Sequence, residues 1–257
     1  MSDYATIQKE CKFGIPAADQ IVFNRYYTVG YSYFLRQPKW VLEIVDPLKI
    51  HEFEEEHVER QDTFRPDFRI PMRFRADLID FKKSGYDRGH LVPNADQSQL
   101  GVQNSETFLL TNMTPQTGGL NRYKWRYLEE AVRKLDMQPH IHETYVMTGP
   151  IIDLSKPTKF IGVDRDRKKE LKEEYNDVDV TIPVPHKFFK SILIENDKGK
   201  HYMWNFIMEN KKEEKALKEY QVTTKKVELL AGIKLWPNLM GDWIEWEKTN
   251  IRNFWDD

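Results

Sequence analysis

Runs rich in β-branched and aromatic residues recur along most of the chain, and short polar or proline-containing segments separate them. Such runs of four to eight or more residues predict β-strands. The predicted strand regions are residues 21–35, 39–45, 107–113, 144–151, 178–185, 187–195 and 202–208. Because strands outnumber helices in this pattern, we expect a central, mostly antiparallel sheet.

One segment has the period of a helix instead. In residues 121–136, the apolar side chains Trp125, Leu128, Val132 and Leu135 recur at steps of three and four. On an ideal helix Asn121 projects onto the same face, and the acidic side chain eight residues later lies at its edge. A second helix is predicted over residues 224–230, ending before a glycine. Sheet and helices together predict an α+β fold, with helices flanking the sheet.

Two strongly charged stretches interrupt the hydrophobic pattern. Residues 164–179 and 210–218 are predicted to be exposed insertions or helices. Neither has the Gly, Ser and Pro content of a flexible linker. The 257 residues suffice for one large mixed domain, so we expect a single domain over residues 1–257.

The charge balance limits how the chain could contact nucleic acid. The formal net charge is −2, whereas proteins that simply coat nucleic acid are usually basic. Any such contact therefore needs a local patch, for which a solvated basic face is the simpler interpretation. The candidate patch consists of Arg65, Arg69, Arg73, Arg75, Lys82, Lys83 and Arg88.

Other residue types exclude further classes of protein. Cys11 is the only cysteine, which excludes an internal disulfide and a cysteine-based zinc cluster. His140 and His142 form an H-x-H pair without acidic ligands nearby, and we expect a surface loop there. No apolar run is long enough to span a membrane, and the first residues lack the features of a signal peptide. We expect an intracellular protein, either cytoplasmic or, after removal of a presequence, mitochondrial.

The segment "SGYDRGHLVPNADQ", residues 84–97, places Asp87, Arg88 and His90 within four residues. A neutral histidine can take a proton from water near neutral pH, and a neighbouring arginine favours that neutral form. The structural alternative is a local salt bridge between Asp87 and Arg88, with His90 in a packing role. This segment alone does not decide between the two.

The segment "LTNMTPQTGGLNRYKWRYLEE", residues 110–130, adds Asn121 and Glu129. An asparagine on an apolar helix face must have its amide satisfied, and a hard cation such as Mg²⁺ accepts a neutral carbonyl oxygen. Eight helical residues span about 12 Å, so direct ligation of one ion by both side chains is difficult. Asn121 as a direct ligand, with Glu129 acting through water, fits better. The alternative is an asparagine that caps the helix and a solvated glutamate.

Taken together, "DRGH", "TNMTPQ" and "LNRYKWRYLEE" resemble the DNA/RNA non-specific endonucleases, and among them the endonuclease G type. The resemblance covers nearly the whole chain. It also includes "CKFGIP", "QPKWVLE", "TFRPD", "YVMTGPI", "IPVPHKFFK" and "AGIKLWPNL" in the expected order. It implies a metal-dependent endonuclease that acts on DNA, RNA or both and leaves 5′-phosphate products. It also implies a ββα-metal motif at the active site and Mg²⁺ as cofactor, with Mn²⁺ as a substitute.

The resemblance assigns roles residue by residue. His90 corresponds to the general base and Asn121 to the direct Mg²⁺ ligand. Glu129 corresponds to the outer-sphere carboxylate, which serves both the metal and catalysis. Asp87 and Arg88 correspond to the supporting acid and to a cation on the phosphate side.

Two further residues are assigned in the same way. Arg65, in "TFRPD", corresponds to a cation near the scissile phosphate, and Asn112 to an asparagine that supports the site. Homodimers occur in this family, which makes a homodimer one expectation here. The segment "LVPNADQSQLG", residues 91–101, departs from the sequences typical of endonuclease G and leaves substrate preference open.

Two other functions compete with a nuclease. A catalytically silent relative that only binds nucleic acid would need positive charge, but would have no use for His90, Asn121 and Glu129. A metal-dependent phosphodiesterase for a small molecule would keep those residues and would not nick plasmid DNA.

Overall fold

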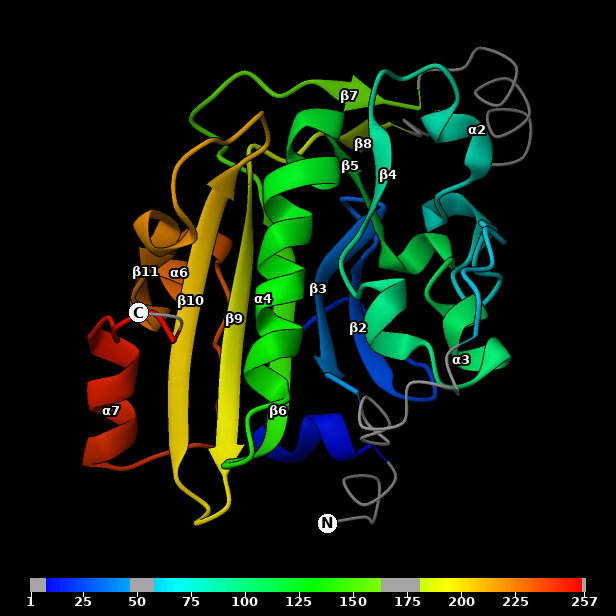
Figure 1. Ribbon diagram of the computed structural model, residues 1–257. Helices are drawn as coiled ribbons and strands as arrows, with labels where there is room; N and C mark the ends of the chain where they lie inside the picture. The colour runs from blue at the N-terminus through cyan, green and yellow to red at the C-terminus, as the bar shows by residue number, and fades with distance from the viewer. Residues whose placement is uncertain (1–7, 47–57, 163–180, 256–257) are drawn as a thin grey trace.

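Seven strands form the large sheet that runs through the molecule (Figure 1), in the order β1-β2-β3-β6-β9-β10-β11. The structure is a computed structural model, and it describes residues 8–46, 58–162 and 181–255. Every neighbouring pair in this sheet is antiparallel. The strands are β1 (Gln20–Phe23), β2 (Tyr27–Ser32), β3 (Gln37–Ile44), β6 (Ile141–Ile151), β9 (Lys187–Asn196), β10 (His201–Glu209) and β11 (Gln221–Val222). The predicted α+β fold with a mostly antiparallel sheet is confirmed.

Most of the predicted strand regions are strands, and two are largely not. The strand predicted over residues 107–113 is wrong, because Leu110–Asn112 form a 3₁₀ turn, η5, and β5 (Met113–Gln116) only begins after it. Of residues 178–185, the first three lie outside the described residues, and only β8 (Ile182–Pro183) is a strand. It pairs with β7 (Phe160–Ile161) apart from the large sheet.

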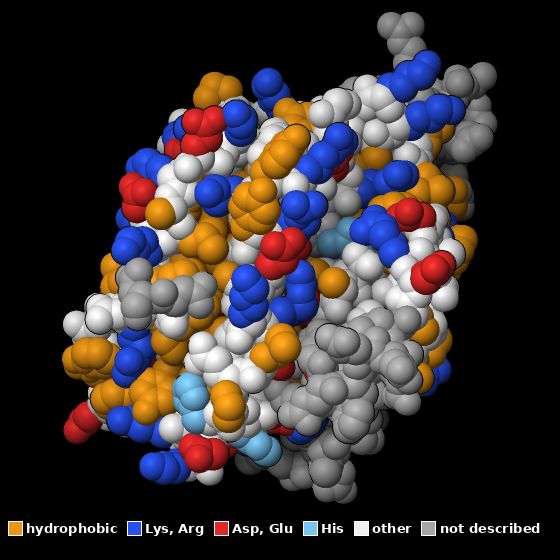
Figure 2. All heavy atoms as spheres, viewed as in Figure 1, with side chains coloured by type: hydrophobic (Ala, Val, Ile, Leu, Met, Phe, Trp, Pro, Cys, Tyr) orange, Lys and Arg blue, Asp and Glu red, His pale blue; other side chains and the backbone are white. Residues whose placement is uncertain are grey.

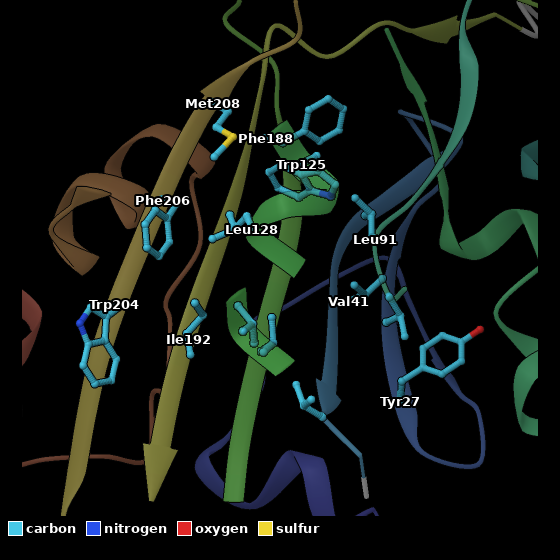
Figure 3. Packing of buried hydrophobic residues seen from close by; sticks show 14 of the residues in the cluster. Tyr27, Val41, Leu91, Trp125, Leu128, Phe188, Ile192, Trp204, Phe206 and Met208 are labelled. Atoms are coloured by element: carbon cyan, nitrogen blue, oxygen red, sulfur yellow. The ribbon is translucent and has the colours of Figure 1, made fainter. Parts of the chain in front are cut away.

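Helices cover both faces of the large sheet. Helix α4 (Arg126–Asp136) packs Leu128 and its other apolar side chains against β9 and β10 (Figure 3). The stripe predicted from Trp125 to Leu135 is buried throughout, with no residue more than 1% exposed. On the opposite face, a second apolar cluster contains residues of α6 (Thr224–Ala231) and α7 (Asp242–Thr249).

The remaining elements are short. Helix α6 matches the prediction, and Gly232 ends it in the left-handed region at φ 65°. Helix α7 lies in the tryptophan-rich C-terminal part of the chain. Leu235 and Trp236 are buried, but α7 exposes Trp243 and Trp246. The other elements are η1 (Lys9–Phe13), η3 (Met72–Phe74), α2 (Leu78–Phe81), η4 (Asn94–Gln97), α3 (Gly101–Glu106) and η7 (Leu217–Tyr220).

The charged stretches and the lone cysteine have different outcomes. Residues 164–179 lie outside the described residues, whereas 210–218 are mostly exposed and mostly not helical.

Cys11 is partly buried, and burial raises the pKa of its thiol to about 11. Within the three described ranges, none of the helices combines the length and apolarity that crossing a membrane requires.

A small hairpin and the start of α4 carry the predicted chemistry. Strand β4 (Asp87–His90) pairs antiparallel with β5, with His90 opposite Met113. The chain then enters η6 (Leu120–Trp125), which is a π-helical turn, and continues directly into α4. The order β4, β5, η6–α4 is the expected ββα arrangement.

The helix predicted from Asn121 therefore starts as a π-helix, not as an α-helix. The wider turn lets Leu120 and Trp125, five residues apart, both enter the core. Asn121 lies within this π-helical turn and is partly buried.

Candidate active site

Asp87 joins the strand that carries His90 to the helix that carries Asn121. The Nδ2 of Asn121 donates to Oδ2 of Asp87 at 3.0 Å. Arg122 donates to the same carboxylate from Nε at 2.9 Å and from Nη2 at 2.6 Å. These bonds from Arg122, and the bond from Asn121, hold the pKa of Asp87 below its ordinary value. The alternative of a local Asp87–Arg88 salt bridge is thus wrong, because Asp87 pairs with Arg122.

The amide of Asn121 is oriented by this contact. Its nitrogen is used by Asp87, while the described residues donate no hydrogen bond to its carbonyl oxygen. The side chain makes no capping bond at the start of η6 or α4. A carbonyl oxygen fixed in this way suits a hard cation that keeps most of its water shell. No group of three or more His, Cys, Asp and Glu that could hold a metal lies in the described part of the chain.

Gly89 has a steric role between Arg88 and His90. A Cβ atom at this position would lie 2.2 Å from Oε1 of Gln116 on the paired strand. Real side chains do not approach so closely, so a larger residue would force the hairpin apart. The glycine of "DRGH" is explained by this approach of Gln116 to the backbone.

His90 lies in an aromatic surround. Its ring makes edge contacts with Phe64, at 5.6 Å between centroids, and with Phe108, at 4.9 Å. Its Nε2 is buried and has no hydrogen-bond partner in the described structure. Burial lowers the pKa of His90 to about 3, and the positive charge of Arg60 adds to this effect. His90 is therefore neutral at neutral pH, as a base must be.

Arg88 and Arg60 lie over the same aromatic pair. The guanidinium of Arg88 lies 4.1 Å from the ring centroid of Phe64, and that of Arg60 lies 5.1 Å from Phe108. Arg60 also donates to Asn94 at 3.0 Å. Arg60 was not among the predicted site residues, because it lies in a polar segment without a recognisable motif.

A cavity of about 790 Å³ opens beside these residues, and cations gather around this part of the surface (Figure 2). Its lining brings together Asp87, Arg88 and Asn121 of the predicted site. His90 and Glu129 do not line it. The other lining residues are Arg60, Asp62, Phe64, Leu78, Phe81, Lys82, Lys83, Tyr86 and Arg122.

The predicted basic patch divides into two parts. Lys82, Lys83 and Arg88 face the cavity. Arg69 is instead bound to Asp67 at 2.7 Å. Arg65 donates from Nη1 to the backbone oxygens of residues 63 and 105, at 3.0 and 2.9 Å, and does not line the cavity.

Asn112 supports the chain immediately after β4. Its side chain accepts from the backbone N–H of Val92 and donates to the Val92 carbonyl, both at 2.9 Å. It also donates to the carbonyl of Thr107 at 2.9 Å. Because Asn112 is fully buried, these three bonds fix the segment that follows His90.

Glu129 lies one helix turn before Arg133 and is partly buried. Burial raises the pKa of Glu129 to about 7, Lys190 opposes this rise and Asp96 adds to it. Burial also holds the pKa of Glu43 well above its ordinary value. Glu129 is thus not the solvated glutamate of the alternative interpretation.

The polar run "NADQSQ", which departs from the expected family sequence, is bound to the core. Asp96 accepts from Arg133 of α4 at 2.6 Å, and Gln97 donates to Glu43 of β3 at 3.1 Å. Asp96 and Gln97 are buried. In the sequence, only the run of amide and acidic residues directly after "DRGH" could have indicated that Asp96 and Gln97 support the site.

Comparison with known proteins agrees with this geometry. The model of the DNA/RNA non-specific endonuclease family matches residues 8–241. The chain belongs to this family, in which metal binding is typical. It is therefore a nuclease, a hydrolase that acts on nucleic acids.

The relatives are named as nucleases, and some of them as endonuclease G. Mitochondrial endonuclease G of Caenorhabditis elegans is 32% identical over 237 residues, which cover 89% of this chain and 71% of the relative. Nuclease C1 of Cunninghamella echinulata is 32% identical, with 89% and 87% covered. The solved structure of an EndoG/EndoGI complex matches with a TM-score of 0.77 and 28% identity, over 93% of this chain and 94% of that chain.

Proposed function

We propose that this chain is a Mg²⁺-dependent endonuclease that hydrolyses phosphodiester bonds in DNA, RNA or both, with His90 as the general base. The observation that carries the proposal is the bond between Asp87 and Asn121. It places the strand of the base and the helix of the candidate metal ligand at one cavity. A protein that only binds nucleic acid would have no need of this arrangement.

His90 provides the base. A water molecule attacks the phosphorus atom in line with the leaving group and gives a proton to the neutral imidazole. The bond from phosphorus to the 3′ oxygen breaks, and that oxygen takes a proton from solvent. The products are a 3′-hydroxyl and a 5′-phosphate. The contacts to Phe64 and Phe108 hold the ring while this transfer occurs.

Asn121 would hold the metal through its carbonyl oxygen, with Glu129 acting through water. A bound divalent ion supplies Lewis-acid stabilisation of the phosphate and of the leaving oxygen. Asp87 accepts from the amide nitrogen of Asn121, which leaves the amide oxygen as the atom that would bind the ion. Mn²⁺ accepts the same oxygen donors and is proposed as a substitute.

Arg88 and Arg60 supply positive charge for the phosphate. Both guanidinium groups line the cavity and are held over aromatic rings. Fixed cations aimed at developing negative charge lower the barrier of such reactions. Arg65, whose Nη1 donates to neighbouring backbone, is proposed as a further cation near the scissile phosphate, and Arg60, which pairs with Asp62, is added to it.

Plasmid nicking tests the proposal directly. The purified protein is compared with His90→Ala in Mg²⁺ and in EDTA, and His140→Ala serves as an exposed control. Loss of a general base slows the reaction about 10²- to 10⁴-fold, and EDTA should stop it. Binding without cleavage would favour the silent relative. Hydrolysis of small diesters without nicking would favour the phosphodiesterase.

The product ends test the direction of cleavage. Nicks with a 3′-hydroxyl and a 5′-phosphate are sealed by a DNA ligase without further treatment. Nicks that first require removal of a 3′-phosphate would contradict the proposed departure of the 3′ oxygen. The same preparation with an RNA substrate shows whether both nucleic acids are cut.

The remaining proposals concern the whole chain. We propose one domain, a homodimer and a mitochondrial or cytoplasmic location, and the name of the Caenorhabditis elegans relative favours the mitochondrion. Light scattering measures the oligomeric state, and a single unfolding transition would support one domain. Fractionation of cells tests the location.

A further inference from the structure

Two tyrosines project from the outer side of the η6–α4 helix, directly after the proposed metal ligand. Tyr123 is 54% exposed and Tyr127 is 44% exposed. They lie four residues apart, so their rings follow one side of the helix. Figure 2 shows hydrophobic side chains over the upper part of α4, bordered by Lys and Arg.

Cations lie near the Tyr127 ring and at the start of η6. Lys124 and Arg126 place their charged groups 5.9 and 5.6 Å from the ring centroid of Tyr127. Lys212 lies against the start of η6, because a Cβ atom on Gly119 would come within 3.0 Å of its Cβ.

The acidic side chains on this face are paired. Glu130 lies 3.3 Å from Arg126 in an ion pair, and Glu214 lies 2.6 Å from Lys212. Each pair also neutralises its cation, so Lys124 provides the net positive charge of this group. The face combines exposed aromatic rings with positive charge, which is the composition of surfaces that bind single-stranded nucleic acid.

The tyrosines are continuous with the proposed active site. Arg122 lines the cavity and binds Asp87, and Tyr123 is the next residue along the chain. A strand whose phosphate lies at Asn121 can therefore extend past Arg122 onto the outer side of the helix. There its bases would meet Tyr123 and then Tyr127.

We propose that Tyr123 and Tyr127 form a stacking subsite for unpaired nucleobases of the strand being cut, with Lys124, Arg126 and Lys212 binding its phosphates. This rests on the proposed nuclease function and adds a substrate preference to it. Bases in a duplex are already stacked on each other and cannot use the subsite without unpairing. The enzyme then favours single-stranded over double-stranded substrate.

The test compares Tyr123→Ala/Tyr127→Ala with Tyr123→Phe/Tyr127→Phe, which keeps the rings. Phe34→Ala removes a more exposed aromatic side chain, 86% exposed and outside this face, and is the control. The readout is the ratio of kcat/KM for a single-stranded oligonucleotide to that for a duplex of the same sequence. Loss of base stacking should lower this ratio at least about tenfold in the alanine variant, mainly through KM. The phenylalanine variant and the control should keep it.

A binding measurement separates this proposal from the proposed function. In EDTA, fluorescence anisotropy of the same single-stranded oligonucleotide gives Kd without cleavage, and the alanine variant should bind at least about fivefold more weakly. Unchanged Kd and an unchanged ratio would overturn the subsite. Failure of the wild-type chain to cut either substrate would instead overturn the nuclease mechanism, while the binding result would still decide the subsite.

Discussion

Asp87 accepts hydrogen bonds from Asn121 and Arg122, and the bond from Asn121 fixes the orientation of that side-chain amide. Without the carboxylate, the amide of Asn121 could turn its nitrogen outward, and a nitrogen donor cannot bind a cation. Residues that orient a ligand in this way typically change metal affinity about 10- to 100-fold. The proposed role of Asp87 as supporting acid therefore predicts an effect on metal binding.

We predict that Asp87→Ala raises the Mg²⁺ concentration required for half-maximal nicking at least about tenfold. The requirement rises because the substitution removes the hydrogen bond to Asn121 and the ion pair with Arg122. A Mg²⁺ titration of the nicking rate measures the shift, and Asp153→Ala, an acid outside the cavity, is the control. An unchanged Mg²⁺ requirement would show that Asp87 does not orient the ligand.

The raised pKa of Glu129 makes the stability of the fold depend on pH. Its folded pKa of about 7 exceeds its ordinary value of 4.5, so the folded state holds the proton over that interval while the unfolded state releases it. Stability due to this group is present below pH 4.5 and is lost as pH rises to about 7. At about 1.4 kcal/mol per pH unit, and allowing for partial exposure, the loss is about 1–3 kcal/mol.

We predict that Glu129→Gln in EDTA is more stable than the wild type above pH 7, by about 1–3 kcal/mol, and equal to it near pH 4.5. Urea unfolding at the two pH values measures this. Glu130→Gln, the exposed neighbour on α4, should show no such difference. A Glu129→Gln chain less stable above pH 7 would mean that the ionised carboxylate is stabilising.

At the scale of elements, the site depends on side chains that connect the segment after β4 to the rest of the fold. Asn112 binds that segment through the backbone of Val92, and Asp96 binds it to α4 through Arg133. Both contacts are buried, so each lost partner would leave an unsatisfied polar group. They explain how a short strand at the surface can hold His90 in one position.

We predict that Asn112→Ala destabilises the fold by about 2–4 kcal/mol, because it leaves backbone groups of Val92 and Thr107 without partners. Its nicking rate should fall as well, since His90 is only two residues from Val92. Chemical unfolding and plasmid nicking measure the two effects. Asn238→Ala, at an exposed position, is the control, and equal stability of both variants would contradict the assigned role.

The sequence was sufficient for elements whose pattern is periodic. The apolar residues from Trp125 to Leu135 recur at helical spacing and are buried in the structure. The strands of the large sheet coincide with runs rich in β-branched residues. The π-turn of η6 was not predictable in this way, because one five-residue step from Leu120 to Trp125 is too short to define a period. The strand predicted near Asn112 failed because side-chain bonds to the backbone held the chain in a turn.

The site itself was predicted only in part. His90, Asp87 and Asn121 could be selected because their motifs are local. Arg60 reaches the site from a distant polar segment, through packing on Phe108, and its sequence gave no signal. Arg65 was selected from its motif, and its role stays a prediction; its Nη1 donates to neighbouring backbone and it does not line the cavity.

For the molecule as a whole, a net charge of −2 hides an uneven distribution. Five cations and two acids, Asp62 and Asp87, line the cavity, so its lining is net positive although the whole chain is net negative. Nucleic acid should therefore bind at this one face and not over the whole surface. The cavity cations are Arg60, Lys82, Lys83, Arg88 and Arg122.

We predict that Lys82→Ala/Lys83→Ala reduces the slope of log K against log salt by about one to two, because each phosphate contact contributes about 0.9. Anisotropy of a labelled oligonucleotide in EDTA, over a range of salt concentrations, gives the slope. Lys198→Ala/Lys234→Ala removes the same charge from exposed positions outside the cavity. If both double variants change the slope equally, binding is not localised at the cavity.

The most direct test of the account is a double-mutant cycle of His90→Ala and Asn121→Ala, with kcat/KM for plasmid nicking in Mg²⁺ as the measurement. Residues that act in one catalytic unit are strongly non-additive. We predict that each single variant loses at least about 10²-fold and that the double variant is no slower than the slower single variant. Losses that multiply, or a single variant with full activity, would contradict one site formed by β4 and η6.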